Sequence, residues 1–371
     1  MELFGFEKLD VTKMRILQLI DSLEAGGAER MAVNYANALA KQIDFSGLVV
    51  SRREGSLLNQ IDDGVSYLFL NRKNVIDFKA LFKLRNYVVI HKVTFVHAHS
   101  TSFFLASLLK LLCPSLKIIW HDHYGESEFL KKRPLLALRL IVPFFSGIIA
   151  VNQKLKLWAQ QRLKFKKVLY LPNFPSEDTV VLEHTVLHGI DGKRIISLAN
   201  LRLQKDHFLL LDVACKLKLS HPEWTFHMVG KDFDDAYSGQ IKSFIVENSL
   251  EKNVFLYGTK RDIKNILYQS TIAILTSKSE GLPVALLEYG LNKKPVVVTN
   301  VGEMASLVQS GINGFLVPSK HKQMFYGALV KLIENDSLQA ELGIALYKKI
   351  QDAYSEEVVI TRYLYWLQNS H

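Results

Sequence analysis

The sequence predicts an α/β protein built from two doubly wound domains that face each other across a cleft. Short runs rich in Val, Ile and Leu alternate with longer segments of helical period, which is typical of parallel sheets covered on both faces. The 371 residues suffice for two domains of ordinary size. The alternation breaks once, between Asn173 and Gly192, where prolines, acidic residues and an Asp-Gly turn indicate a linker.

The expected elements form two series along the chain. Strands of the first series are predicted at 15–20, 47–51, 67–70, 95–99, 117–122, 147–152 and 168–171. Strands of the second are predicted at 194–198, 225–229, 254–257, 272–276, 295–299 and 315–317, with helices between them such as 29–42, 208–219 and 284–291. The predicted boundaries are an appendage at 1–13, a first domain at 14–175, a linker at 176–192, a second domain at 193–352, and a C-terminal helix at 353–371 that packs back toward the first domain.

Composition places the chain among ordinary globular proteins. Hydrophobic residues make up 49% and charged residues 22%, which is enough apolar mass for two cores. No apolar run approaches the ~20 residues that a spanning helix needs, so no transmembrane helix is expected. Cys113 and Cys215 lie far apart in apolar runs, which favours two buried thiols and a reducing, cytoplasmic location.

The net charge of +10 is concentrated in one stretch. Residues 129–167 contain ten Lys or Arg and no Asp or Glu, interleaved with Leu, Phe and Trp. A basic surface with apolar side chains suits anionic lipid head groups, so an anionic membrane surface is the predicted partner. The alternative is a helix with a core-facing stripe and a solvated basic face; nucleic acid is not expected.

A glycine pair follows the first predicted strand and opens a helix. Gly26 and Gly27 let backbone N–H groups approach an anion closely, and a helix N-terminus favours negative charge. The spacing is neither the G-x-G-x-x-G fingerprint nor a P-loop. A tight turn without a ligand is the alternative.

A second motif follows the predicted strand 272–276. Here Ser279, Glu280, Gly281, Leu282 and Pro283 lead into a helix that contains Glu288. Pro283 suits the first helical position, and the free N–H groups of that helix would meet a diphosphate. The two carboxylates could accept hydrogen bonds from sugar and ribose hydroxyls; a plain surface role for Glu288 is the alternative.

These residues carry a resemblance to a known family. Two glutamates separated by seven residues, with Gly281 and Pro283 between them, resemble the signature of the retaining glycosyltransferases of family 4, which have the GT-B fold of two Rossmann-like domains. Three further segments agree with this family in order and spacing, namely the glycine pair, 201–207 with its Arg and Lys, and 300–317. The resemblance spans roughly residues 14–350.

The resemblance implies a hexosyltransferase that needs no metal and no cofactor other than its donor, most simply a UDP- or GDP-sugar. The donor-binding residues would be Gly26, Gly27, Arg202, Lys205, Glu280, Gly281, Leu282, Pro283 and Glu288. The catalytic residues would be His99, Arg202, Lys205 and Glu280, in which the two cations stabilise the diphosphate leaving group. The acceptor would be a carbohydrate or a lipid-linked sugar, used in cell-surface polysaccharide or glycolipid assembly on the inner membrane face.

Four histidines end two neighbouring strands. His97 and His99 close one strand, and His121 and His123 flank Asp122 at the end of another. Residues two apart on a strand share a face, so a metal site is one interpretation. The family resemblance instead implies that His99 contacts the donor sugar, and that His121 and Asp122 face the acceptor side of the cleft.

Two alternative functions stay open at this point. One is a nucleotide-sugar epimerase of the same fold, since a fold does not fix a function. The other is a metal-dependent hydrolase built on His97, His99, His121 and His123. The D-x-D sequence at 232–234 could formally hold a metal, but it is short and common, so we interpret it as a polar loop.

Overall fold

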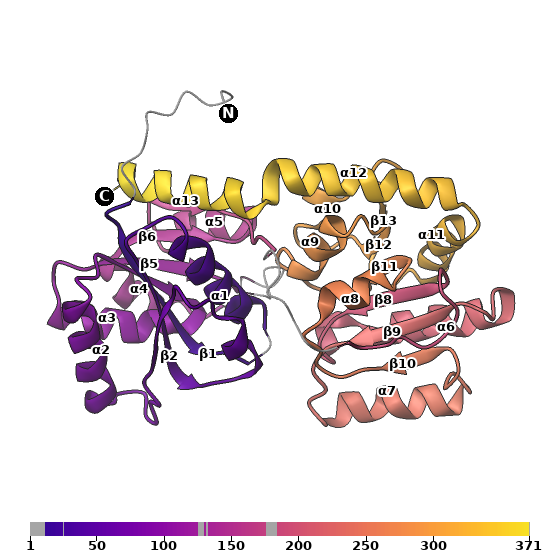
Figure 1. Cartoon of the computed structure of the whole chain (residues 1–371), viewed down its shortest axis with the longest axis horizontal. Coiled ribbons are helices and arrows are strands. Elements are labelled where there is room, and N and C mark those ends of the chain that lie inside the picture. Colours follow the sequence, from indigo (N-terminus) through magenta and orange to yellow (C-terminus); the bar gives the residue numbers. More distant parts are fainter. Residues whose placement is uncertain (1–11, 25, 125–129, 131–132, 176–183, 371) are drawn as a thin grey trace. The chain divides into compact units, whose positions relative to one another are not determined.

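The computed structural model describes residues 12–24, 26–124, 130, 133–175 and 184–370, which divide into two compact α/β units (Figure 1). Unit 1 contains the described residues up to Tyr124, those from 130 to 175, and the segment from Glu356 onward. Unit 2 contains those from 184 to Ser355. Most of the expected appendage and the first half of the expected linker lie outside the described residues. The predicted α/β class is confirmed, whereas the cleft stays a prediction.

Unit 1 is a seven-stranded parallel sheet in the order β3-β2-β1-β4-β5-β6-β7. Its strands are β1 (Arg15–Ser22), β2 (Phe45–Arg53), β3 (Ser66–Phe69), β4 (Phe95–His99), β5 (Lys117–Asp122), β6 (Phe145–Ala150) and β7 (Val168–Tyr170). The direction in which strands are added reverses between β1 and β4: β2 and β3 extend the sheet on one side of β1, and β4 to β7 extend it on the other. Such a switch point is where open α/β sheets bind ligands, at the carboxyl ends of the strands.

Helices cover both faces of this sheet. The helices α2 (Phe78–Ile90), α3 (Phe103–Leu112), α4 (Leu136–Ile141) and α5 (Gln153–Arg162) all pack on one hydrophobic core. A separate core lies under α1 (Gly27–Ala40), and α13 (Glu356–Ser370) packs beside α1. Tyr35 of α1 and Tyr363 of α13 meet edge to face with ring centroids 5.2 Å apart. The C-terminal segment therefore completes the cover of unit 1.

Unit 2 is a six-stranded parallel sheet in the order β10-β9-β8-β11-β12-β13. Its strands are β8 (Arg194–Leu198), β9 (Thr225–Val229), β10 (Val254–Leu256), β11 (Ile272–Leu275), β12 (Val296–Thr299) and β13 (Phe315–Val317). Its helices are α6 (His207–Ser220), α7 (Ala236–Glu247), α8 (Ile263–Tyr268), α9 (Val284–Leu291), α10 (Met304–Leu307), α11 (Lys322–Ile333) and α12 (Asp336–Tyr354). Two hydrophobic clusters flank the sheet, which agrees with a doubly wound arrangement.

Local side chains explain where several helices begin. The carboxylate of Asp77 accepts the N–H of Ala80 at the start of α2, and Asn152 does the same for Leu155 at the start of α5. Because Asn152 is the cap of α5, β6 ends at Ala150, two residues earlier than the sequence predicted. These caps satisfy N–H groups that have no partner within a helix.

Two sequence-based expectations about helices need correction. Pro283 is the capping residue of α9 and has extended backbone angles, so Val284 rather than Pro283 takes the first helical position. Helix α1 begins at Gly27 and not at Glu29, because Gly26 already provides the extended cap. Within the part of the chain that the structure describes, no helix is both long and apolar enough to cross a bilayer.

Candidate functional site

Two loops of unit 2 lie together at the carboxyl ends of β8 and β11. The first loop ends in a 3₁₀ turn at Leu203–Lys205, and the second leads into α9. The hydroxyl of Thr276 donates to the carbonyl of Lys205 (2.9 Å), and the N–H of Lys278 donates to the carbonyl of Gln204 (2.7 Å). These bonds hold the two loops in register and bring distant residues together.

Lys205 and Glu280 form an ion pair at this junction. Lys205 Nζ lies 2.5 Å from Glu280 Oε1, and the Ser277 hydroxyl donates to the same oxygen at 2.6 Å. The Glu280 residue is only 7% exposed, so these donors replace much of the water that would otherwise solvate its carboxylate. A charge held in such surroundings is stabilised mainly by its partner and hydrogen bonds. The structure thus joins two residues that the sequence assigned to the donor site.

Arg202 lies exposed beside an aromatic ring. Its guanidinium carbon is 4.3 Å from the centroid of Phe233, and Lys231 Nζ lies 5.2 Å from the same ring. Phe233 is the middle residue of the D-x-D sequence, which we interpreted as a polar loop. A cation over an aromatic face is attracted to it, so Phe233 can hold the guanidinium in place. Sequence reasoning missed Phe233 and Lys231 as neighbours of Arg202.

Three aspartates near this site are paired with lysines. Asp232 and Asp234 both contact Lys242, at 2.6 and 3.2 Å. Lys278 contacts Asp206, which lies in the left-handed region with φ of 50°. A non-glycine residue in this region carries backbone strain, which is common next to functional sites.

The backbone around Glu280 is closely packed. The N–H of Glu303 donates to the carbonyl of Gly281 at 3.1 Å. Gly302 has φ of 58°, and a Cβ placed there would lie 2.1 Å from the carbonyl oxygen of Glu280. Leu282 and Pro283 are buried, and Glu288 is half-buried on α9. Glycine is therefore needed at 302 for the loop that carries Glu280.

The glycine pair of unit 1 has a carboxylate next to it. Gly26 is extended and caps α1, and Gly27 is exposed as the first helical residue. A Cβ on Gly26 would lie 2.2 Å from a carboxylate oxygen of Glu29. Glu29 therefore interacts favourably with this helix start, and an anion approaching Gly26 would meet its charge. Diphosphate binding at the glycine pair stays a prediction.

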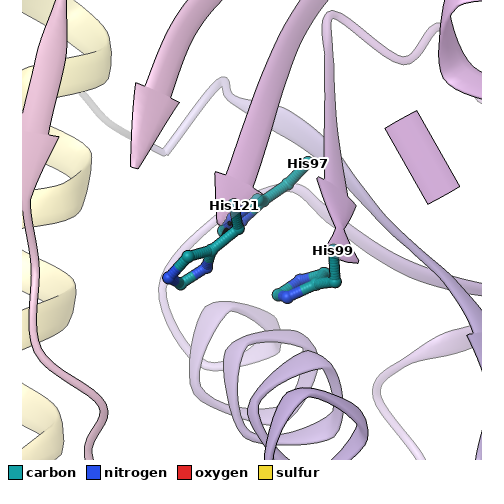
Figure 2. Close-up of side chains that lie close together, drawn as sticks. All are labelled: His97, His99 and His121. Carbon is teal, nitrogen blue, oxygen red and sulfur yellow. Dashed lines mark hydrogen bonds between the residues drawn. The ribbon is translucent and has the colours of Figure 1, made fainter. Parts of the chain in front are cut away.

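Three histidines of unit 1 gather where β4 and β5 end, with their rings close together (Figure 2). His97 Nε2 lies 3.0 Å from His121 Nδ1. The two nitrogens of His99 contact His123 at 3.0 Å and Gln18 Oε1 at 2.9 Å. Facing nitrogen atoms of His97, His99 and His121 all lie within 4.8 Å of one another, which is a spacing that a transition metal could draw together.

This histidine cluster is enclosed by apolar and aromatic side chains. His97, His99 and His121 have no exposed surface. The ring of Tyr35 packs against them, and Phe174 packs against Tyr35. Burial lowers the pKa of all three well below its usual value, so the imidazoles are neutral. His97 Nδ1 and His121 Nε2 make no hydrogen bond with any described residue.

Sequence reasoning expected His99, His121 and Asp122 to face a cleft, but their side chains are buried in unit 1. Contact of His99 with a sugar stays a prediction. It requires the side chains around His99 to move, because the imidazole is fully buried in this structure. A hydrolase would likewise need water and substrate to reach the cluster. The burial therefore weighs against a metal-dependent hydrolase centred here.

Asp122 is bound by a residue that sequence reasoning did not single out. Arg133 donates two hydrogen bonds to its carboxylate, at 2.6 and 2.8 Å. The guanidinium also lies over the rings of Tyr124 and Trp158, at 4.4 and 4.3 Å. This buried, bidentate pair holds Asp122 firmly, and its role toward an acceptor stays a prediction. The only feature of the sequence that hints at this pair is that Arg133 lies in the basic stretch close to aromatic residues.

Two family models match the chain in succession. The model "Glycosyltransferase Family 4" matches residues 25–175, and "Glycosyl transferases group 1" matches residues 186–349. The first model covers most of the strands and helices of unit 1 up to β7, and the second covers most of unit 2. Between them they contain every residue of the predicted donor site.

Similar proteins are glycosyltransferases by name. An uncharacterized glycosyltransferase of Haemophilus influenzae is 26% identical over 327 residues, covering 86% of this chain and 90% of that protein. The Escherichia coli UDP-Gal:alpha-D-GlcNAc-diphosphoundecaprenol alpha-1,3-galactosyltransferase is 21% identical, with 89% of each chain covered. A Staphylococcus aureus poly(ribitol-phosphate) alpha-N-acetylglucosaminyltransferase is 23% identical over 66% of this chain and 48% of that protein.

Solved structures share the fold. Anabaena Alr3699/HepE in complex with UDP superposes with a TM-score of 0.75 at 18% identity, covering 96% of this chain and 100% of the other. TarM superposes with a TM-score of 0.77 at 15% identity, covering 96% and 99%. At this identity the likeness shows the fold alone, and it confirms the predicted GT-B fold of two Rossmann-like domains.

Proposed function

The chain belongs to the glycosyltransferases, and we propose that it is a retaining enzyme of the family-4 type that moves a sugar from a nucleotide-diphosphate sugar to an acceptor hydroxyl. The observation that carries this proposal is the junction of Arg202, Lys205 and Glu280 at the carboxyl ends of β8 and β11. Two cations and one carboxylate lie where open α/β sheets bind ligands, and they match the needs of a diphosphate and a sugar.

The proposed chemistry uses charge rather than a side-chain nucleophile. The bond between the anomeric carbon and the diphosphate breaks, and the acceptor oxygen bonds to that carbon on the same face. The acceptor proton passes to a diphosphate oxygen. Arg202 and Lys205 stabilise the charge that develops on the leaving group, and the start of α9 adds favourable dipole. Glu280 accepts hydroxyl hydrogen bonds of the donor sugar, and Glu288 those of the ribose.

The proposed donor is a UDP- or GDP-sugar, bound without a metal ion. Solved structures of Alr3699/HepE hold UDP and UDP-glucose, which supports a uridine donor here. Glu280, Asp206 and both carboxylates of the D-x-D sequence each contact a lysine, which makes them less available to a magnesium ion. Arg202 and Lys205 supply the positive charge that a metal would otherwise bring.

The proposed acceptor is a carbohydrate or a lipid-linked sugar, used in cell-surface polysaccharide or glycolipid assembly at the cytoplasmic face of a membrane. The name of the Escherichia coli relative specifies a diphosphoundecaprenol-linked acceptor. In the basic stretch, Leu136 and Leu140 are 77% and 70% exposed on α4, one turn apart beside Arg139. His99 would contact the donor sugar, and His121 and Asp122 would act on the acceptor side of unit 1. Lys131 and Lys132 of this stretch lie outside the described residues.

A thermal-shift experiment tests the donor site. UDP, GDP, ADP and CMP are added, with and without EDTA, to the wild type and to Glu288→Ala. A ligand that binds only the folded state raises the melting temperature, so one nucleoside diphosphate should stabilise the wild type regardless of EDTA. Glu288→Ala should reduce that shift, whereas the exposed Glu341→Ala on α12 should keep it.

Other outcomes favour the other functions. No shift with any nucleotide, or a shift that EDTA removes, would count against this donor site and for a metal-dependent activity. Conversion of the nucleotide sugar in the absence of any acceptor would instead indicate an epimerase.

A further inference from the structure

Helix α2 of unit 1 has apolar side chains on both of its faces. Ala80, Leu81, Leu84 and Val88 are buried in the core, as expected for an amphipathic helix. On the opposite side, Phe78 is 68% exposed and Phe82 is 52% exposed. An exposed group of large apolar residues on a folded protein marks a place where something binds.

The exposed apolar side chains of α2 follow the period of the helix. Phe78, Phe82 and Val89 lie four and seven residues apart, so they form one stripe along the helix. Lys79 and Lys83 flank this stripe one position further along. The loop before α2 continues the apolar surface, because Val75 and Ile76 are 62% and 54% exposed.

The segment that contains α2 is strongly basic. Between Gly64 and His121 the sequence has eight Lys or Arg and a single acidic residue, Asp77. The Asp77 carboxylate accepts backbone N–H groups at the start of α2, which holds its pKa below its usual value. Arg72 is buried and paired with Asp21, but Lys73, Lys79 and Lys83 are exposed near the stripe, so the surface there attracts anions.

Neighbouring helices extend this surface. The helices α2, α3, α4 and α5 pack on the same hydrophobic core and so cover the same face of the sheet. Leu111 of α3 is 61% exposed, and Leu136 and Leu140 of α4 are more exposed still. The helices on this face of the sheet thus carry exposed apolar side chains in succession, with basic residues around those of α2.

We propose that α2 docks unit 1 on a bilayer that contains anionic lipids. Phe78, Phe82 and Val89 enter the boundary between head groups and acyl chains, while Lys79 and Lys83 extend to lipid phosphates. A second copy of the chain fits this surface less well, because two such faces would bring like charges together. The inference rests on the proposed function for its membrane location, and it adds the surface of unit 1 that would make the contact, centred on α2 outside 129–167.

Vesicle sedimentation tests the docking helix. The full chain is mixed with vesicles of phosphatidylcholine, with or without phosphatidylglycerol, and the bound fraction is measured. The variant Phe78→Ser/Phe82→Ser should bind the anionic vesicles about tenfold more weakly or worse, because two large apolar side chains are lost. The matched control is Leu219→Ser/Val246→Ser, which removes apolar residues that are 86% and 62% exposed on α6 and α7 of unit 2. This control should bind like the wild type.

Two further variants identify the mode of binding. Lys79→Glu should weaken binding to anionic vesicles several-fold and leave binding to neutral ones unchanged. Phe82→Trp should show a blue-shifted fluorescence maximum on anionic vesicles, because its indole enters the lipid.

Three results would overturn the proposal: unchanged binding of the double serine variant, no blue shift of the Phe82→Trp variant on anionic vesicles, or a wild-type dimer that the double serine variant turns into a monomer. Nucleoside diphosphates should stabilise the wild type and the double serine variant equally, which shows that the variant is folded. If no nucleotide stabilises the wild type, the proposed function fails while the docking result still stands.

Discussion

Lys205 and Glu280 are 75 residues apart in the sequence, and their contact depends on hydrogen bonds that join two loops. The sequence could name both residues through a family signature, but it could not show that they pair. It also could not show that Phe233 lies under Arg202, since that contact depends on how the loop after β9 folds back. Side chains that meet across loops are set by tertiary packing, which no local pattern specifies.

The Lys205–Glu280 pair predicts strong coupling between the two residues. Lys205→Met should destabilise unit 2 by roughly 1–3 kcal/mol, because it leaves a nearly buried carboxylate without its cation. Adding Glu280→Gln should restore part of that loss, since the uncompensated charge is removed. Urea unfolding of the wild type, the two single variants and the double variant measures the coupling. Strictly additive effects would contradict the pair, and the double variant should still fail to bind nucleoside diphosphate.

His227 predicts a loss of stability in acid. It is buried between Thr225 and Tyr257, and burial lowers its pKa to about 3. The unfolded chain takes up the proton near pH ~6.5, so the contribution of His227 is complete above that pH and is lost as the pH falls toward its folded pKa.

As the pH falls below about 6.5, the free energy of unfolding that His227 contributes should decrease by up to about 1.4 kcal/mol per pH unit. Between pH 7 and pH 5 the decrease should total roughly 2 kcal/mol. The free energy of unfolding, measured with urea at several pH values, should change less steeply with pH for His227→Gln than for the wild type. The exposed His321→Gln variant controls for the loss of a surface histidine. An unchanged slope in His227→Gln would rule out this origin.

Helices and strands were easier to predict than these contacts. The strands Phe95–His99 and Lys117–Asp122 occur as predicted, because apolar runs bounded by polar residues are a local signal. The bounds of α9 occur as predicted, but Pro283 is its cap and not its first helical residue, and α1 begins two residues earlier than predicted. Both differences depend on backbone angles at the cap positions Gly26 and Pro283. The histidine pattern predicted rings on one face of each strand, but their burial comes from Tyr35 and Tyr363 on distant helices.

Gly302, in the loop before α10, leads to a prediction about stability when a single methyl group is added. Gly302→Ala should destabilise the protein by roughly 1–3 kcal/mol, because its backbone is left-handed and the new Cβ would clash with the carbonyl of Glu280. Gly239→Ala, within α7 and with open space around it, should instead stabilise by about 0.5–1 kcal/mol. Thermal unfolding of both variants makes the comparison. Equal effects of the two substitutions would contradict the packing described around Glu280.

The two units have separate hydrophobic cores, which predicts two unfolding transitions for the whole molecule. A nucleoside diphosphate that binds the loops of unit 2 should raise only one of them. Deletion of 356–371 should lower the other, because Val359, Ile360, Tyr363 and Leu367 of α13 are fully buried in unit 1. Differential scanning calorimetry measures both effects. A single transition moved by both changes would show that the units unfold together.

The assignment of α13 to unit 1 has a consequence for synthesis on the ribosome. The strands of unit 1 emerge first, yet the helix that covers Tyr35 and His97 follows only after the whole of unit 2. At translation rates of about 5–20 residues per second, the delay is roughly 10 to 40 seconds. During that interval the nascent chain exposes an apolar, histidine-lined surface to solvent. Chaperones that hold such surfaces would act on unit 1 until α13 emerges, so unit 1 completes its folding after unit 2 has been synthesised.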